Sequence, residues 1–231
     1  MSNPPARRSD LRVLIIEDHT LFAESLELAL GMEGYDVRRP PPTLDGSQAA
    51  LLSAVIKLRP RIVLLDLDLG RLGDGLRLIA PLASSGALVA VVTASADRGR
   101  WGECLRLGAR TVMSKAQPLN EILATVRRLN EGLPVMARAE RESLLQAWQG
   151  SREKQQEART RLHRLTAREQ QVLARLYEGR SVREIARLSV VSEATVRTQV
   201  KSILAKLEVS SQLAAVGIAH SISWRPPEPD G

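Results

Sequence analysis

Acidic, hydroxyl and lysine side chains follow several apolar runs of this sequence, and such a set can do phosphate chemistry. Glu17 and Asp18 follow one run, Asp66 ends another, and Thr93 and Lys115 end two more. Carboxylates gathered at one place repel one another, which is tolerable if they hold a hard divalent cation such as Mg²⁺. A carboxylate beside that metal can accept a phosphoryl group, while a lysine and a hydroxyl bind the phosphoryl oxygens. The set therefore predicts metal-assisted phosphoryl transfer if the fold brings its members together.

Five short apolar stretches in the first half predict the strands that would position these side chains. Most are continuously apolar and each is followed by apolar residues at helical spacing, which is typical of a parallel sheet covered on both faces. We expect strands at 13–16, 35–37, 62–66, 88–93 and 111–114, and helices at 21–32, 47–58, 75–80, 100–107 and 119–129, the third ending near Pro81. The predicted fold class is α/β, a flavodoxin-like, doubly wound, five-stranded parallel sheet. In such a sheet the chemistry gathers at the carboxyl ends of the strands, where the acids stand.

The last part of the chain carries helical signals only. Thr166 and Ser181 are each followed three residues later by a glutamate, the capping-box pattern of a helix start. Ser192 is a third N-cap candidate, and Ser210 or Ser211 opens a fourth helix. Two of these helices are joined by a tight turn, and the second exposes Arg, Thr, Gln and Lys side chains. The pattern fits a helix-turn-helix, although a plain helical bundle would give the same periodicity.

Composition and charge narrow the class of protein. The 231 residues are 44% hydrophobic and 26% charged, which favours two folded domains over a disordered chain. The longest apolar run has six residues, against about 20 for a bilayer span, so we expect no membrane segment. A single cysteine and no visible signal peptide predict a cytoplasmic protein. The formal charge of +7 is spread almost evenly along the chain, so charge alone identifies no partner.

Residues 133–164 differ from the parts on either side. They are rich in Arg, Glu and Gln, and we expect a linker that is partly helical. Leu144, Leu145 and Trp148 could form one apolar face of that helix and make a helical dimer contact. The predicted organisation is an α/β domain at 1–132, the linker at 133–164, a four-helix domain at 165–222 and a flexible tail at 223–231.

The first domain resembles the receiver domain of two-component response regulators. The motifs that carry the resemblance are Glu17-Asp18 after the first strand, Leu65-Asp66 ending the third, Thr93-Ala94 ending the fourth and Lys115 ending the fifth. The resemblance implies that a sensor histidine kinase phosphorylates Asp66. The resemblance also implies that Asp18, Asp66 and the backbone carbonyl of Asp68 bind Mg²⁺, and that Glu17 helps through water. Thr93 would move toward the phosphoryl group, and Lys115 would form an ion pair with that group.

Two features leave other interpretations of this domain open. Receiver domains usually have Tyr or Phe three residues before the lysine, as a switch that rotates, and here Val112 stands there. The domain could therefore be an interaction module that works without phosphorylation. Asp66-Leu67-Asp68 also resembles the nucleophile motif of haloacid-dehalogenase-type phosphatases, but Gly70 stands where that family has Thr or Val, and the phosphatase reading leaves Glu17 unexplained.

The last domain resembles the LuxR-type DNA-binding domain of NarL/FixJ response regulators. The matching residues are Leu165-Thr166, Arg168-Glu169, Val172-Leu173, Glu184-Ile185-Ala186, Val191-Ser192, Thr195-Val196, Val200, Ile203-Leu204, Lys206-Leu207 and Ala214-Ala215. The resemblance implies a second helix whose exposed side binds double-stranded DNA. We expect its core side to hold Val196, Val200, Ile203, Leu204 and Leu207, and its DNA contacts to be Thr195, Arg197, Thr198, Lys201 and Lys206.

These resemblances together predict a DNA-binding response regulator that controls transcription and is not an enzyme. Mg²⁺-dependent phosphorylation of Asp66 would switch it, and the active form would be a homodimer on paired half-sites. The phosphorylation-independent regulator remains the alternative because Val112 has no ring to rotate.

Overall fold

Five parallel strands in the order β2-β1-β3-β4-β5 form the sheet of the first half, in a computed structural model that describes residues 11–40 and 47–225. The strands are β1 (Arg12–Ile16), β2 (Asp36–Arg38), β3 (Ile62–Leu65), β4 (Leu88–Thr93) and β5 (Thr111–Ser114). This strand order confirms the doubly wound prediction and reverses direction between β1 and β3. Ile16 pairs with Leu65, and Thr93 pairs with Ser114, so the strand ends that carry the predicted site residues lie in register.

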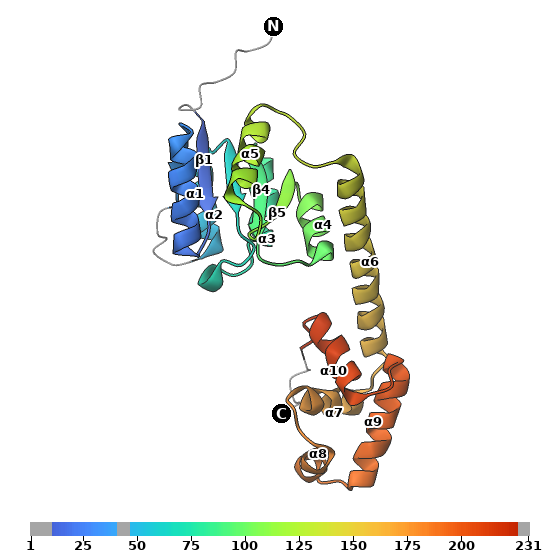
Figure 1. Cartoon of the computed structure of the whole chain (residues 1–231). Coiled ribbons are helices and arrows are strands. Elements are labelled where there is room, and N and C mark those ends of the chain that lie inside the picture. The colour runs from blue at the N-terminus through green and yellow to red at the C-terminus, as the bar shows by residue number, and fades with distance from the viewer. Residues whose placement is uncertain (1–10, 41–46, 226–231) are drawn as a thin grey trace. The chain divides into compact units, whose positions relative to one another are not determined.

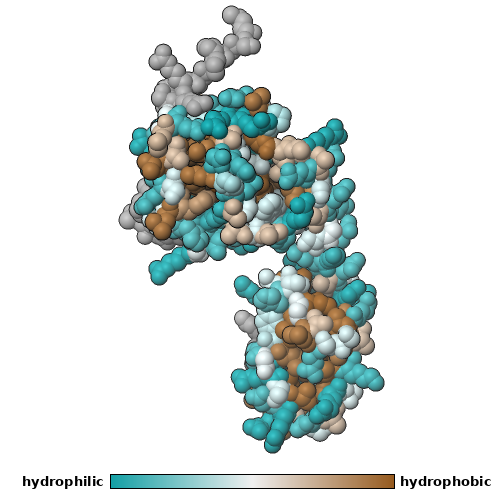
Figure 2. All heavy atoms as spheres, viewed as in Figure 1, coloured by the Kyte–Doolittle hydropathy of each residue, from teal (hydrophilic) through white to brown (hydrophobic). Residues whose placement is uncertain are grey.

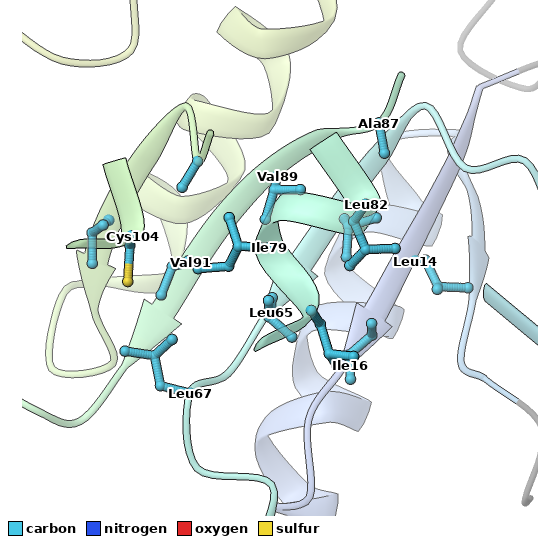
Figure 3. Packing of buried hydrophobic residues seen from close by; sticks show 14 of the residues in the cluster. Leu14, Ile16, Leu65, Leu67, Ile79, Leu82, Ala87, Val89, Val91 and Cys104 are labelled. Carbon is cyan, nitrogen blue, oxygen red and sulfur yellow. The ribbon is translucent and has the colours of Figure 1, made fainter. Parts of the chain in front are cut away.

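Helices cover both faces of this sheet, because alternate residues of each buried strand point to opposite sides (Figure 1). α1 (Thr20–Met32) and α5 (Leu119–Asn130) pack on one face. α2 (Gln48–Lys57), α3 (Leu76–Ser84) and α4 (Arg98–Arg106) pack on the other. Figure 3 shows this second core, in which Ile16, Leu65 and Val91 of the strands meet Ile79 and Cys104 of the helices.

The helix predicted to end near Pro81 continues to Ser84, so that boundary was wrong. Proline lacks the N–H that would bond back to Arg77, which normally weakens a helix at this point. The last turn survives because Leu82 is fully buried beside Leu78 and Ile79 in the core under the sheet. Burial of apolar surface therefore outweighs the local preference of proline.

The segment predicted as a partly helical linker contains one continuous helix, α6 (Arg138–His163). The chain divides into two compact units between Gln149 and Gly150, so the first half of α6 belongs to the first unit. Leu144 is fully buried in that unit's core, with Leu145 packed beside it. The apolar face that we expected to make a dimer contact is thus used inside the chain, because α4 offers a surface for it.

The second unit holds four short helices after α6. They are α7 (Ala167–Tyr177), α8 (Val182–Ser189), α9 (Glu193–Leu207) and α10 (Gln212–Ser221). Both predicted capping boxes are present, and Ser192 and Ser211 cap α9 and α10 through their hydroxyls. Figure 2 shows hydrophobic residues gathered over α10 and its neighbours on the viewed face.

At the start of the predicted tail at 223–231, Trp224 contacts the second unit. Trp224 is partly buried against the core of the second unit, and its backbone N–H donates to the carbonyl of Ala219. Residues 226–231 lie outside the described part. No single helix within 11–40 and 47–225 is long and apolar enough to span a membrane. α9 and α10, bent by 53°, meet the length and composition test only as a pair.

The turn between α8 and α9 contains Val190 in the left-handed region, at φ 54° and ψ 45°, with 91% of the residue exposed. A β-branched residue is strained in this conformation. Val190→Gly should therefore stabilise the second unit by about 1 kcal/mol, measured by urea unfolding of the full chain. Val182→Gly, the same change at the first helical position of α8, should instead destabilise it. Equal effects of the two changes would contradict the strain at Val190.

Candidate functional site: an acidic pocket and a recognition helix

The acidic pocket lies at the carboxyl ends of β1 and β3, where the strand order of the sheet reverses. The backbone N–H of Asp66 donates to the carbonyl of Ile16, which holds Asp66 directly beside the end of β1. Lys115 is tied to β4 in the same way, because its N–H donates to the carbonyl of Thr93. The ladder hydrogen bonds therefore position the site residues before any side chain contributes.

Lys115 holds two carboxylates of the pocket together. Its Nζ lies 2.6 Å from Oδ2 of Asp66 and 2.7 Å from Oε1 of Glu17. Asp66 is almost completely buried, and its other oxygen accepts a 2.7 Å hydrogen bond from the N–H of Leu67. Hydrogen bonds between charged groups are stronger than those between neutral groups. Lys115 therefore holds the carboxylates of Asp66 and Glu17 firmly in place.

The pKa of Lys115 reflects the same arrangement. Burial by itself would lower it, but the hydrogen bonds to Asp66 and Glu17 outweigh burial and raise the pKa above its usual value. Lys115 therefore stays protonated at neutral pH. A permanent positive charge at this point can bind an anionic group attached to Asp66.

Asp18 and His19 complete the pocket on its solvent side. Nδ1 of His19 lies 3.0 Å from both Glu17 Oε1 and Asp18 Oδ1, and one ligand atom from each of these residues and from Asp66 fits within 4.8 Å. Three carboxylate oxygens that converge in this way suit a hard cation that retains several waters, as Mg²⁺ does. His19 was not among the predicted site residues, although its place directly after the acidic pair was a signal.

Asp68 and Thr93 are the two predicted pocket residues whose side chains lie outside the cluster of acids. The side chain of Asp68 is exposed, stands outside the cluster and accepts a 3.3 Å hydrogen bond from the N–H of Gly70. Only its backbone carbonyl was predicted as a ligand, and that prediction does not depend on the side chain. Thr93 is buried at the end of β4, where its hydroxyl oxygen accepts a 3.2 Å hydrogen bond from the N–H of Ser95.

α9 presents three of the predicted DNA contacts on its exposed side. Arg197, Thr198 and Lys201 are exposed, whereas the side facing the core buries Val196, Val200, Ile203 and Leu207, with Leu204 partly buried. Arg197 forms a 3.4 Å ion pair with Glu193 one turn earlier, and exposed pairs of this kind are worth little. Arg197 can therefore leave Glu193 for a base or a phosphate at low cost.

Thr195 and Lys206 each contact other residues of the same domain. The N–H of Thr195 donates to the capping hydroxyl of Ser192, and its own hydroxyl lies 2.9 Å from that oxygen. Lys206 points its Nζ at Oε2 of Glu169, 2.6 Å away, and Ser202 donates to the other oxygen of Glu169 at the same distance. The structure thus pairs Lys206, whose side chain is partly exposed, with the buried carboxylate of Glu169.

Two arginines that our sequence analysis gave no role hold the turn between α8 and α9. Arg175 donates to the hydroxyl of Ser189 and, at 3.5 Å, to the carbonyl of Ile185. Arg168 reaches the carbonyl of Ser189, also at 3.5 Å. Both lie on α7, so α7 holds the end of α8 at the point where the chain turns into α9.

Both halves of the chain match known families. Residues 13–127 match the response regulator receiver domain, and residues 163–219 match the LuxR family of bacterial regulatory proteins. A sheet with an acidic pocket at its switch point and a helix-turn-helix with an exposed basic face are therefore joined in one chain. That combination defines a class of protein, the DNA-binding response regulators.

Relatives match over nearly the full length. The chain is 32% identical over 221 residues to the probable transcriptional regulatory protein NarL of Mycobacterium tuberculosis, covering 95% of this chain and 97% of that protein. It is 26% identical over 212 residues to the transcriptional regulatory protein LiaR of Bacillus subtilis, covering 91% and 97%. A solved two-component response regulator RcsB–DNA complex aligns at 24% identity and TM-score 0.49, covering 92% of this chain and 98% of that one. The chain belongs to the two-component response regulators with a LuxR-type DNA-binding domain.

Proposed function

We propose that phosphorylation of Asp66 switches this response regulator and that α9 reads double-stranded DNA. The observation that supports phosphorylation of Asp66 is the pair of hydrogen bonds from Lys115 to Asp66 and Glu17, at 2.6 and 2.7 Å, within the cluster of acids. In this proposal residues 1–132 form the receiver, 133–164 the linker and 165–222 the DNA-binding domain. The protein acts in the cytoplasm by binding rather than by turning over a substrate.

The phosphoryl group would come from the phosphohistidine of a sensor histidine kinase. A carboxylate oxygen of Asp66 attacks phosphorus, the bond from phosphorus to the kinase histidine breaks, and the histidine takes up a proton. Lys115 and the hydroxyl of Thr93 then bind phosphoryl oxygens. Mg²⁺, held by Asp18, Asp66 and the carbonyl of Asp68 with Glu17 acting through water, would neutralise phosphoryl charge.

The alternatives gain no support from the pocket. An interaction module that works without phosphorylation has no need for a buried aspartate held by a lysine, and that is what Asp66 and Lys115 form. A haloacid-dehalogenase-type phosphatase would use Asp68 as well as Asp66. Here the side chain of Asp68 lies outside the acidic cluster, on an exposed turn.

DNA binding is best tested by selecting bound fragments from genomic DNA with the full chain, with and without beryllofluoride and Mg²⁺. We expect a pair of repeated half-sites to be enriched, because one α9 contacts only a short stretch of groove and a homodimer presents two. Enrichment should be stronger with the phosphate mimic. Recovery of fragments without any shared sequence would contradict DNA reading by α9.

Arg197 is the strongest candidate for reading a base. Arg197→Ala should relax the sequence preference at one position of each half-site and cost about 1–3 kcal/mol against the preferred base, because arginine can bind guanine through two hydrogen bonds. Arg180→Ala is a matched control, since Arg180 is an exposed arginine of the same unit that pairs with Glu178 and Glu184. Selection with the control should return the unchanged site. Unchanged preference with Arg197→Ala would remove Arg197 from the base-reading residues.

A further inference from the structure

Three consecutive residues of α4 make three different contacts. Arg100 forms a 2.7 Å ion pair with Asp74, in the loop that follows the phosphorylation site. Trp101 donates its indole N–H to the carbonyl of Ser95, 2.8 Å away. Gly102 is buried against α6. α4 is therefore attached to the loops that follow β3 and β4 at two residues and to α6 at the next.

The contact with Ser95 leads directly to Thr93. The N–H of Ser95 donates to the hydroxyl oxygen of Thr93, and the carbonyl of the same residue accepts the indole N–H of Trp101. If the hydroxyl of Thr93 turns toward a phosphoryl group, Ser95 loses the acceptor that holds its N–H. The loop then moves, and the indole of Trp101 must follow or lose its partner.

The contact with α6 depends on the absence of a side chain at Gly102. A Cβ there would overlap the carbonyl oxygen of Leu144 and lie 2.7 Å from the Cβ of Trp148. Around this point Arg98 donates to the hydroxyl of Ser143 at 3.2 Å, and the guanidinium of Arg106 lies 4.8 Å above the ring of Trp148. α6 therefore lies close against α4 along one side, and a small shift of α4 breaks several contacts at once.

We propose that Trp101 relays the position of Thr93 to α6, and that α6 is released from α4 when Asp66 is phosphorylated. The relay rests on the phosphorylation proposed above. It gives the chain an aromatic side chain coupled to Thr93, although Val112 occupies the place of the usual rotating ring. Trp101 acts here as a positioning residue, because it touches neither the acidic cluster nor DNA.

Amide hydrogen exchange of residues 138–149 in the full chain tests the release. With beryllofluoride and Mg²⁺ we expect exchange to become about threefold to tenfold faster, the range that corresponds to losing a hydrogen bond. Trp101→Phe keeps a ring in the core but removes the indole N–H. This variant should bind beryllofluoride, as followed by titration calorimetry, while its exchange at 138–149 stays within about twofold of the value without the mimic.

Gly102→Ala tests the α4–α6 contact without any phosphate mimic. The added methyl group should push α6 away and make exchange at 138–149 fast from the start. Gly150→Ala is the matched control, because a Cβ at Gly150 in the same helix meets nothing within 4 Å. Its exchange should be no faster than that of the wild type.

The outcomes separate the relay from the phosphorylation it rests on. If beryllofluoride changes DNA binding but leaves exchange at 138–149 unchanged, the relay is wrong and the phosphorylation proposal stands. If beryllofluoride does not bind, both are wrong. A full response in Trp101→Phe overturns the role of the indole, and wild-type exchange in Gly102→Ala overturns the contact with α6.

Discussion

Asp66→Asn is expected to abolish incorporation of phosphate from radiolabelled acetyl phosphate and to remove every effect of beryllofluoride on DNA binding. The amide has no negative charge with which to attack phosphorus. It also leaves Lys115 with Glu17 as its remaining carboxylate partner among the contacts that the structure shows. We expect the largest functional effect here, because Asp66 is the proposed phosphoryl acceptor and its carboxylate is buried at the end of β3 against Lys115.

Asp68→Asn is the matched control for this prediction. The change keeps the backbone carbonyl that is the proposed ligand and alters only an exposed side chain outside the acidic cluster. Incorporation should stay close to that of the wild type. Loss of labelling in both variants would mean that the side chain of Asp68 is required. Labelling in Asp66→Asn would show that a different residue accepts the phosphoryl group.

Glu169→Ala is expected to give the largest loss of stability, about 3 kcal/mol in the second unit. Glu169 is 6% exposed and accepts hydrogen bonds from Lys206, Ser202 and both the backbone and hydroxyl of Thr166. Its removal leaves the partly exposed Lys206 without its carboxylate and takes away one half of a capping box. Urea unfolding of the full chain, followed by Trp224 fluorescence with Trp101 and Trp148 changed to Phe, would measure the loss.

Glu184→Ala provides the comparison, since Glu184 closes the capping box of α8 in the same way. Its carboxylate is exposed and, among the described contacts, pairs with no lysine. Its removal should therefore lower the free energy of unfolding by clearly less than the removal of Glu169. If both changes destabilise equally, the cap rather than the contact of Glu169 with α9 would be the source of the effect.

The same carboxylate predicts how stability depends on pH. Burial alone would raise the pKa of Glu169, but the hydrogen bonds from Lys206, Ser202 and Thr166 lower it from 4.5 to about 2. A folded-state pKa below the unfolded value stabilises the fold above pH 4.5 and loses that contribution as the pH falls toward 2. The loss should be about 2 kcal/mol, because the partly exposed Lys206 weakens the pair. It should be absent in Glu169→Ala.

Most of the sheet could be predicted from the sequence, because each strand is a short apolar run and the acids stand at its end. Val13 to Ile16 and Ile62 to Leu65 are buried on both sides, which makes their pattern continuous and easy to recognise. The capping boxes at Thr166 and Ser181 were equally predictable, since each depends on residues only three positions apart. Local pattern is enough where the stabilising partner is also local.

Other features depend on partners that are distant in the chain. Pro81 lies inside α3 because the sheet buries the turn beyond it. The apolar face around Leu144 was predicted to contact a second chain. In the structure α4 packs against it, and α6 can approach so closely because Gly102 has no side chain. Neither outcome follows from the residues near it, since each depends on which element packs against it.

The sequence by itself indicated the class of the protein, through the resemblance of its strand-end acids and lysine to receiver domains and of residues 165–222 to LuxR-type domains. The tertiary structure decided which charged residues remain available. Lys206 and Glu169 lie 37 positions apart and meet because α7 packs on α9, so that Lys206 has an ion-pair partner within the domain that its place in the sequence does not reveal. Lys115 and Asp66 lie 49 positions apart and meet because β5 and β3 end at the same edge of the sheet. A charge has no fixed role until the fold supplies its neighbours, and those neighbours set its energy.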